Sequence, residues 1–83
     1  MIFNKYEDNF NIISKNLKCI REEKGMSQDS LSGKLALLGI TLYQSDIFKI
    51  EHNQRHVRDF ELWGITQVLN ITSEDLYSTN TDN

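Results

Sequence analysis

Apolar residues recur along most of the chain at spacings of three and four, which is the period of a helix with one buried face. The pattern predicts a first helix from residue 9 or 10 to residue 24 and a second after Ser27. A third begins near residue 44, a fourth follows Asp59, and a short fifth opens at Thr72 or Ser73. The residues expected on the buried faces are Ile13, Leu17, Ile20, Leu31, Leu35, Leu38, Leu42, Ile47, Ile50, Leu62, Trp63, Ile65, Leu69 and Leu76.

Residues that start and stop helices stand at the ends of these stripes. Gly25 and Gly39 are expected to end the first two helices, and Asn70 the fourth, because a left-handed residue commonly closes a helix. Ser27 and Asp59 are the expected N-caps of the second and fourth helices. With no proline and four glycines in 83 residues, the chain is predicted to be an all-α bundle of five helices with short connectors.

Length and composition narrow the class of protein further. A chain of 83 residues forms a single domain. A lone cysteine, Cys19, cannot form an internal disulfide and suits a reducing cytoplasm. No segment has the ~20 apolar residues of a membrane span, and the N-terminus lacks the apolar run of a signal peptide. We expect a cytoplasmic protein without membrane contact, with an N-terminal leader at residues 1–9, the domain at 10–77 and a flexible tail at 78–83.

Charge is unevenly distributed along the chain. The formal net charge is −3, yet residues 15–58 hold eight basic and five acidic side chains. The acidic excess therefore lies at the ends and in the last third. A basic face, and not the total charge, is what nucleic acid requires. The small size of the excess predicts modest, strongly salt-dependent electrostatic affinity.

Few residues offer catalytic or metal-binding chemistry. His52 and His56 stand four apart across an expected helix end, with no third ligand in view, so a solvated loop is the better interpretation. No isolated carboxylate pair or Ser/His/Asp set is apparent, and we expect no metal, no cofactor and no enzymatic activity. Cys19 is expected to be a partly buried filler. Phe60 and Trp63 are expected in the core, in preference to a dimer contact.

The segment from Asn16 to Glu51 carries a recurrent motif. It opens with Ile-Arg, continues with Gly-Met-Ser-Gln and closes with Ile-x-x-Ile-Glu. This set resembles the DNA-binding domain of the lambda-repressor and Cro-like family, also called the xenobiotic-response-element family, over about residues 12–76. The resemblance implies an all-α, five-helix, phage-repressor-like helix-turn-helix bundle. The matching residues are Ile20, Arg21, Gly25, Met26, Ser27, Gln28, Leu31, Ile47, Lys49, Ile50 and Glu51.

The resemblance also implies roles for individual residues. A side chain at the start of the second helix holds the DNA backbone, the third helix reads bases in the major groove, and the loop after it touches phosphate. Gln, Ser and Lys are suited to base edges by their hydrogen-bonding groups. Arg21 and Glu51 match a structural ion pair of the family. The candidate DNA-binding residues are Gln28, Tyr43, Gln44, Ser45, Phe48, Lys49, Asn53 and Arg55.

Two functions follow from these observations. The first is a sequence-specific regulator of transcription, acting as a repressor and binding a pseudo-palindromic operator in double-stranded DNA as a homodimer. The second is a protein-interaction module, such as an antitoxin or a repressor-modulating adaptor, with little DNA affinity and a regulatory protein partner. Asp46, Phe48 and the acidic total favour the second. A capping box between Thr41 and Gln44 would also turn Gln44 away from the bases.

Overall fold

A computed structural model describes residues 7–78 of the chain. Within them the chain forms five helices and no extended strand, as the periodicity predicted. Residues 1–6 and 79–83, most of the predicted leader and tail, lie outside the described part, and the predicted domain boundaries remain a prediction. The helices are α1 (Ser14–Glu23), α2 (Gln28–Leu37), α3 (Gln44–Glu51), α4 (Asp59–Leu69) and α5 (Ser73–Tyr77).

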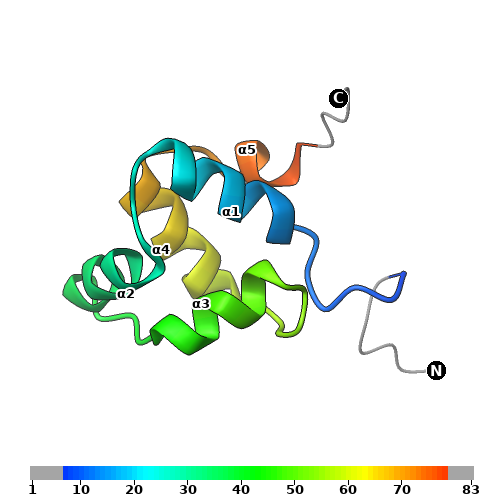
Figure 1. Cartoon of the computed structure of the whole chain (residues 1–83), viewed down its shortest axis with the longest axis horizontal. Helices are drawn as coiled ribbons and strands as arrows, with labels where there is room; N and C mark the ends of the chain where they lie inside the picture. The colour runs from blue at the N-terminus through cyan, green and yellow to red at the C-terminus, as the bar shows by residue number, and fades with distance from the viewer. Residues whose placement is uncertain (1–6, 79–83) are drawn as a thin grey trace.

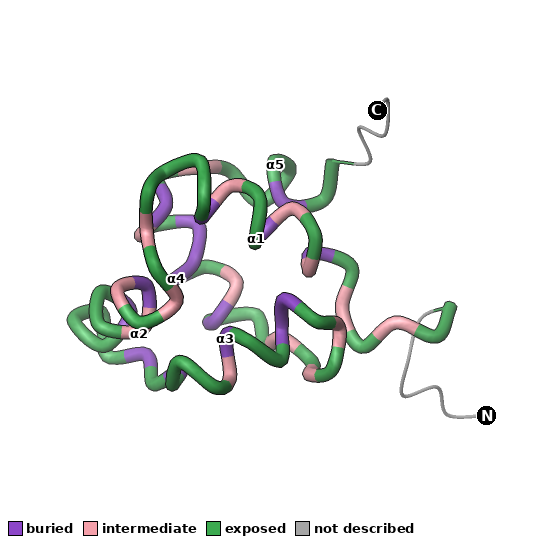
Figure 2. The backbone as a smooth tube through the Cα atoms, viewed as in Figure 1, coloured by how far each residue is buried: buried purple, intermediate pink, exposed green. Residues whose placement is uncertain are grey.

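The helices surround one apolar core (Figure 1). Helix α2 packs against α3 and α4, while α1 packs against α3 and α5. The buried positions fall on the inner side of each helix, and outward positions are exposed (Figure 2). None of the helices in residues 7–78 is long and apolar enough to cross a membrane. The buried apolar residues are Ile13, Leu17, Leu31, Leu35, Ile40, Leu42, Ile47, Ile50, Ile65, Leu69 and Leu76.

Local signals placed several helix ends correctly. Gly25, Gly39 and Asn70 adopt positive φ angles of 67°, 81° and 57°. The Ser27 hydroxyl accepts the Ser30 N–H at 2.9 Å, which caps α2 as expected. Ser27 begins α2, Gly39 follows its end, and a short turn leads from there to α3, as in a helix-turn-helix.

Helix α1 is shorter at its start than predicted, because long-range hydrogen bonds hold residues 9–11 outside it. Asn53 Oδ1 accepts the N–H groups of Phe10 and Asn11 at 2.8 and 3.2 Å. The Asn11 amide donates in turn to the carbonyls of Ile50 and Arg55, at 3.0 and 2.9 Å. The segment before Ser14 is thereby tied to the end of α3, and its backbone groups are satisfied without a helix.

The predicted cap of α4 was wrong, and the possible capping box at the start of α3 does not form. Helix α4 is capped by Arg58, and Asp59 is its first residue. Here the Glu61 carboxylate accepts the Arg58 backbone N–H at 2.9 Å. Helix α3 is capped by Tyr43, so no box forms between Thr41 and Gln44.

Four apolar or sulfur-containing side chains predicted to be at least partly buried are exposed. Leu38 follows the last residue of α2 and is 44% exposed, because the helix ends before it can turn inward. Phe60 and Trp63 lie on the outer face of α4, opposite Ile65. Cys19 is also exposed. The apolar core is therefore formed without these four side chains.

Gly64 lets α4 approach the turn between α2 and α3. A Cβ atom at this position would overlap the Ile40 side chain and lie 3.0 Å from Leu35 Cδ2. A side chain at this position would therefore require the Ile40 and Leu35 side chains to shift where α4 packs against the turn.

Candidate nucleic-acid interface

Helix α3 is anchored on one side and open on the other. Ile47, Ile50 and Glu51 are buried against the core. At its start, the Asp46 carboxylate accepts the Tyr43 backbone N–H at 2.8 Å. Asp46 also lies 3.7 Å from the guanidinium of Arg55. The Asp46 carboxylate is thus partnered within the fold. Its negative charge therefore counts less against DNA binding by α3 than the sequence suggested.

The opposite side of α3 forms an exposed surface that we call the α3 face. It combines an amide, a hydroxyl, an aromatic ring, an ammonium group and an imidazole on about two turns of helix. A helix with one buried and one exposed face is the form that enters a major groove. The residues of the α3 face are Gln44, Ser45, Phe48, Lys49 and His52.

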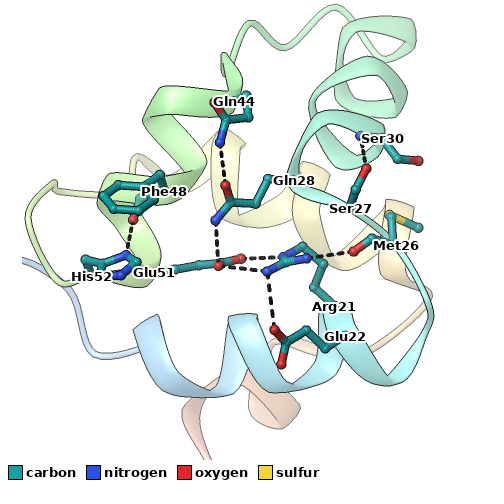
Figure 3. Close-up of polar contacts among 10 residues, drawn as sticks. All are labelled: Arg21, Glu22, Met26, Ser27, Gln28, Ser30, Gln44, Phe48, Glu51 and His52. Atoms are coloured by element: carbon teal, nitrogen blue, oxygen red, sulfur yellow. Dashed lines mark hydrogen bonds and ion pairs between the residues drawn. The ribbon is translucent and has the colours of Figure 1, made fainter.

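A chain of hydrogen bonds connects the core to this face (Figure 3). Arg21 donates to both carboxylate oxygens of Glu51, at 2.6 and 3.0 Å. Glu51 Oε1 also accepts from Gln28 Nε2 at 2.9 Å. Gln28 Oε1 then accepts from Gln44 Nε2 at 2.5 Å. The ion pair predicted between Arg21 and Glu51 is present, and it is buried.

The direction of this chain is fixed by its buried end. A carboxylate paired with a guanidinium can only accept hydrogen bonds, so Gln28 must turn its NH₂ group toward Glu51. Its oxygen then faces Gln44, which must present an NH₂ group in turn. Both amides are therefore oriented by the fold. One N–H of Gln28 remains outside the chain, as do one N–H and the oxygen of Gln44.

The buried ion pair is electrostatically reinforced. The hydrogen bond to Glu51 raises the pKa of Arg21, against the opposing effect of burial. Arg21 also donates to the Met26 carbonyl at 2.7 Å, which ties the pair to the turn before α2.

The chain is similar to solved structures, one of them over most of both chains. That structure is the restriction-modification controller protein C.AhdI from Aeromonas hydrophila, with a TM-score of 0.71 and 25% sequence identity. The similarity covers 86% of this chain and 98% of C.AhdI. No family model and no curated protein matches the chain. The chain has the helix-turn-helix fold of the lambda-repressor and Cro-like type.

The loop that follows α3 in this helix-turn-helix domain is internally bonded. Asn53 adopts the left-handed conformation, and its side chain holds the segment before α1. Arg55 forms two hydrogen bonds to Glu61, at 2.8 and 3.1 Å. The bond to Glu61 raises the pKa of Arg55 against the effect of burial. Both residues were predicted to touch phosphate, and their present partners give them structural roles as well.

Glu61, a buried acid in the first turn of α4, is the partner of this loop. Burial would raise the pKa of Glu61, but hydrogen bonds from the Arg55 guanidinium and the Arg58 backbone N–H outweigh it, and the pKa is lowered. The carboxylate therefore stays charged and holds the loop to the start of α4.

His52 belongs to the α3 face, although the sequence suggested only a solvated loop. Its Nδ1 lies 2.9 Å from the Phe48 carbonyl oxygen, and its ring stacks on that of Phe48 with centroids 3.9 Å apart. The spacing of four between the two residues was the available signal. His56 instead meets the edge of the Phe10 ring at 5.0 Å. Residues 7–78 contain no group of three or more ligands that could hold a metal.

Proposed function

We propose that the chain is a sequence-specific DNA-binding regulator of transcription that reads the major groove with α3. The observation that carries the proposal is the oriented Gln28–Gln44 pair. Adenine presents an N7 acceptor and an N6 donor in the major groove. The remaining N–H and the oxygen of Gln44 match these two groups. Because Gln44 is already oriented, little conformational entropy is lost on binding.

The second N–H of Gln28 supports a phosphate contact beside this base contact. Gln28 opens α2, where free backbone N–H groups and the helix dipole favour an anion. Lys49, farther along α3, adds a mobile positive charge for guanine or phosphate. Ser45 and Tyr43 complete the proposed interface at the start of α3. Asn53 and Arg55 lie at the margin of the proposed interface, because their side chains already form hydrogen bonds within the domain.

We propose further that the regulator acts as a repressor and binds as a homodimer. Phe60 and Trp63 are 50% and 53% exposed on α4, and aromatic side chains are enriched at protein interfaces. C.AhdI, the similar structure, is a restriction-modification controller protein, which supports a regulatory role. Two copies related by a two-fold axis would read two half-sites of a pseudo-palindrome.

The experiment is selection of bound DNA from a random-sequence pool, at low and at near-physiological salt. We expect enrichment of a two-fold symmetric sequence that survives the added salt. Lys49→Ala should then weaken binding about tenfold and lower the salt slope by about one. Lys18→Ala, an exposed lysine on α1, is the matched control and should change neither strongly.

Binding that is absent, or that is unspecific and lost with salt, would overturn the proposal. The alternative function, a protein-interaction module with little DNA affinity, would then be the one to pursue, through the exposed face of α4. An unchanged affinity of Lys49→Ala would reject the docking of α3.

A further inference from the structure

Phe48 and His52 form a stacked pair in the middle of the α3 face. Their ring centroids are 3.9 Å apart and the planes differ by 20°. The His52 Nδ1–H donates to the Phe48 carbonyl at 2.9 Å, so the imidazole is fixed at both its ring and its nitrogen (Figure 3). The Phe48 side chain is nevertheless 43% exposed. An aromatic ring is thus held at the surface.

This arrangement is not explained by core packing. The buried side of α3 is formed by Ile47 and Ile50, which are fully buried. Gln44, Phe48 and His52 follow one another at intervals of four and form a single row on the outer side. The ring of Phe48 therefore lies between a base-reading amide and an imidazole, where a polar side chain would cost less in water. An exposed ring at this position calls for an apolar partner.

The major groove offers one apolar group on its base edges, the 5-methyl group of thymine, which 5-methylcytosine also carries. We infer that Phe48, positioned by His52, is the specificity-determining contact for a 5-methylpyrimidine in each half-site. The inference rests on the proposed function, since it requires that α3 enter the major groove. It adds a class of base to that function. It also gives His52 a role, because His52 positions Phe48 and does not contact the base itself.

His52 acts by limiting where the Phe48 ring can lie. Without a neighbour, an exposed side chain samples several rotamers, and ordering it on binding costs free energy. The stack removes part of this cost and keeps the ring against the helix surface. His52 is therefore a positioning residue, and its effect should appear in discrimination between bases with and without the methyl group more than in folding.

The test replaces each thymine of the selected operator by uracil, one position at a time, since the two bases differ only in the methyl group. We expect one position in each half-site at which uracil weakens binding about fourfold, the value of one buried methyl-sized group. At that position, an operator with a 5-methylcytosine–guanine pair should bind more tightly than an operator with an unmethylated cytosine–guanine pair, by a similar factor. Phe48→Ala should bind thymine and uracil operators equally.

Variants of the stacked pair separate positioning from structure. His52→Ala should bring the thymine-to-uracil ratio toward one, and His52→Tyr, which keeps a stacking ring, should restore it. Tyr77→Ala removes an exposed aromatic ring from α5 and should leave the ratio at the wild-type value. Thermal unfolding of each variant shows that it is folded.

Three results would overturn the inference. The first is an operator whose affinity no uracil substitution changes. The second is an operator whose uracil sensitivity persists unchanged in Phe48→Ala. Both leave the proposed function intact, because specific DNA binding would still have been measured. The third is failure to select any specific DNA, which rejects the proposed function and this inference together.

Discussion

Gln28 Oε1 accepts a hydrogen bond from Gln44 Nε2 at 2.5 Å, across the turn of the helix-turn-helix. The first helix of the motif therefore orients the first side chain of the second. A double-mutant cycle on operator binding measures this coupling. Gln28→Ala and Gln44→Ala should be non-additive by about 0.5–3 kcal/mol, as expected for hydrogen-bonded neighbours.

A matched pair of distant substitutions serves as its control. Gln67 is exposed on α4, and Gln67→Ala should combine additively with Gln44→Ala within about 0.5 kcal/mol. Additive effects of the Gln28 and Gln44 substitutions would contradict the role of the contact in binding. The affinity measurements need the operator sequence selected beforehand.

The buried ion pair gives a prediction on stability. Glu51→Ala leaves the Arg21 guanidinium buried without its carboxylate, and should lower the free energy of unfolding by about 3–5 kcal/mol. That is a large part of the ~5–15 kcal/mol that stabilises an ordinary domain. The double variant Arg21→Met with Glu51→Leu, which buries no charge, should lose less. Denaturation by urea checks both.

Glu22 provides the control for this prediction. Its carboxylate lies 4.0 Å from Arg21, and its side chain is 57% exposed. Glu22→Ala should change the free energy of unfolding by less than about 1 kcal/mol, the value typical of an exposed pair. A loss as large as that of Glu51→Ala would mean that general charge balance, and not the buried contact, stabilises the domain.

The sequence predicted those parts of the fold that local signals determine. Leu17, Leu31 and Ile47 recur on helical stripes, and Gly25 and Asn70 occupy left-handed positions that few other residues adopt readily. The Arg21–Glu51 pair followed from the family resemblance, because the two residues stand 30 positions apart without any local pattern. Both ends of the Gln28–Gln44 contact were predicted as site residues, but their mutual contact was not.

The remaining differences come from long-range contacts. Asn11 bonds to groups 39 and 44 residues away, so nothing near it in sequence predicts that it stays outside α1. On α4, apolar residues occupy more than one side of the helix, and periodicity alone does not decide which of them face the core. The position of Gly64 determines which side of α4 faces the core. Gly64 lies against Ile40, and Trp63 is therefore on the outer side.

Glu61 makes stability depend on pH in the acid range. Its pKa is lower in the folded chain than its usual value, so the unfolded chain binds the proton more readily. The stabilisation is present above the usual glutamate pKa of roughly 4.3 and is lost as pH falls through the lowered value. Glu61→Gln should therefore differ most from the wild type near neutral pH and progressively less on acidification.

Urea denaturation of both proteins at several pH values measures this difference. Glu74→Gln is the matched control, because Glu74 is exposed on α5 and should give a nearly constant difference. A gap between wild type and Glu61→Gln that stays constant down to about pH 3 would show that the Arg55–Glu61 contact contributes through packing alone.

The exposed face of α4 gives a prediction on assembly. Trp63 and Phe60 lie one helical turn apart, and buried aromatic residues at the centre of an interface commonly contribute most of its binding energy. If this face joins two copies of the chain, Trp63→Glu should shift sedimentation toward the monomer and weaken operator binding. Folding stability should hardly change, because the indole is 53% exposed in the single chain.

Leu37→Glu is the control for this substitution. Leu37 is 86% exposed at the end of α2, so the variant removes an exposed apolar side chain and adds the same charge on another helix. We expect its self-association to equal that of the wild type. If Leu37→Glu loses the dimer and Trp63→Glu keeps it, the interface lies at the end of α2 and not on α4. A wild-type chain that stays monomeric at every concentration, and on its operator, would reject the homodimer.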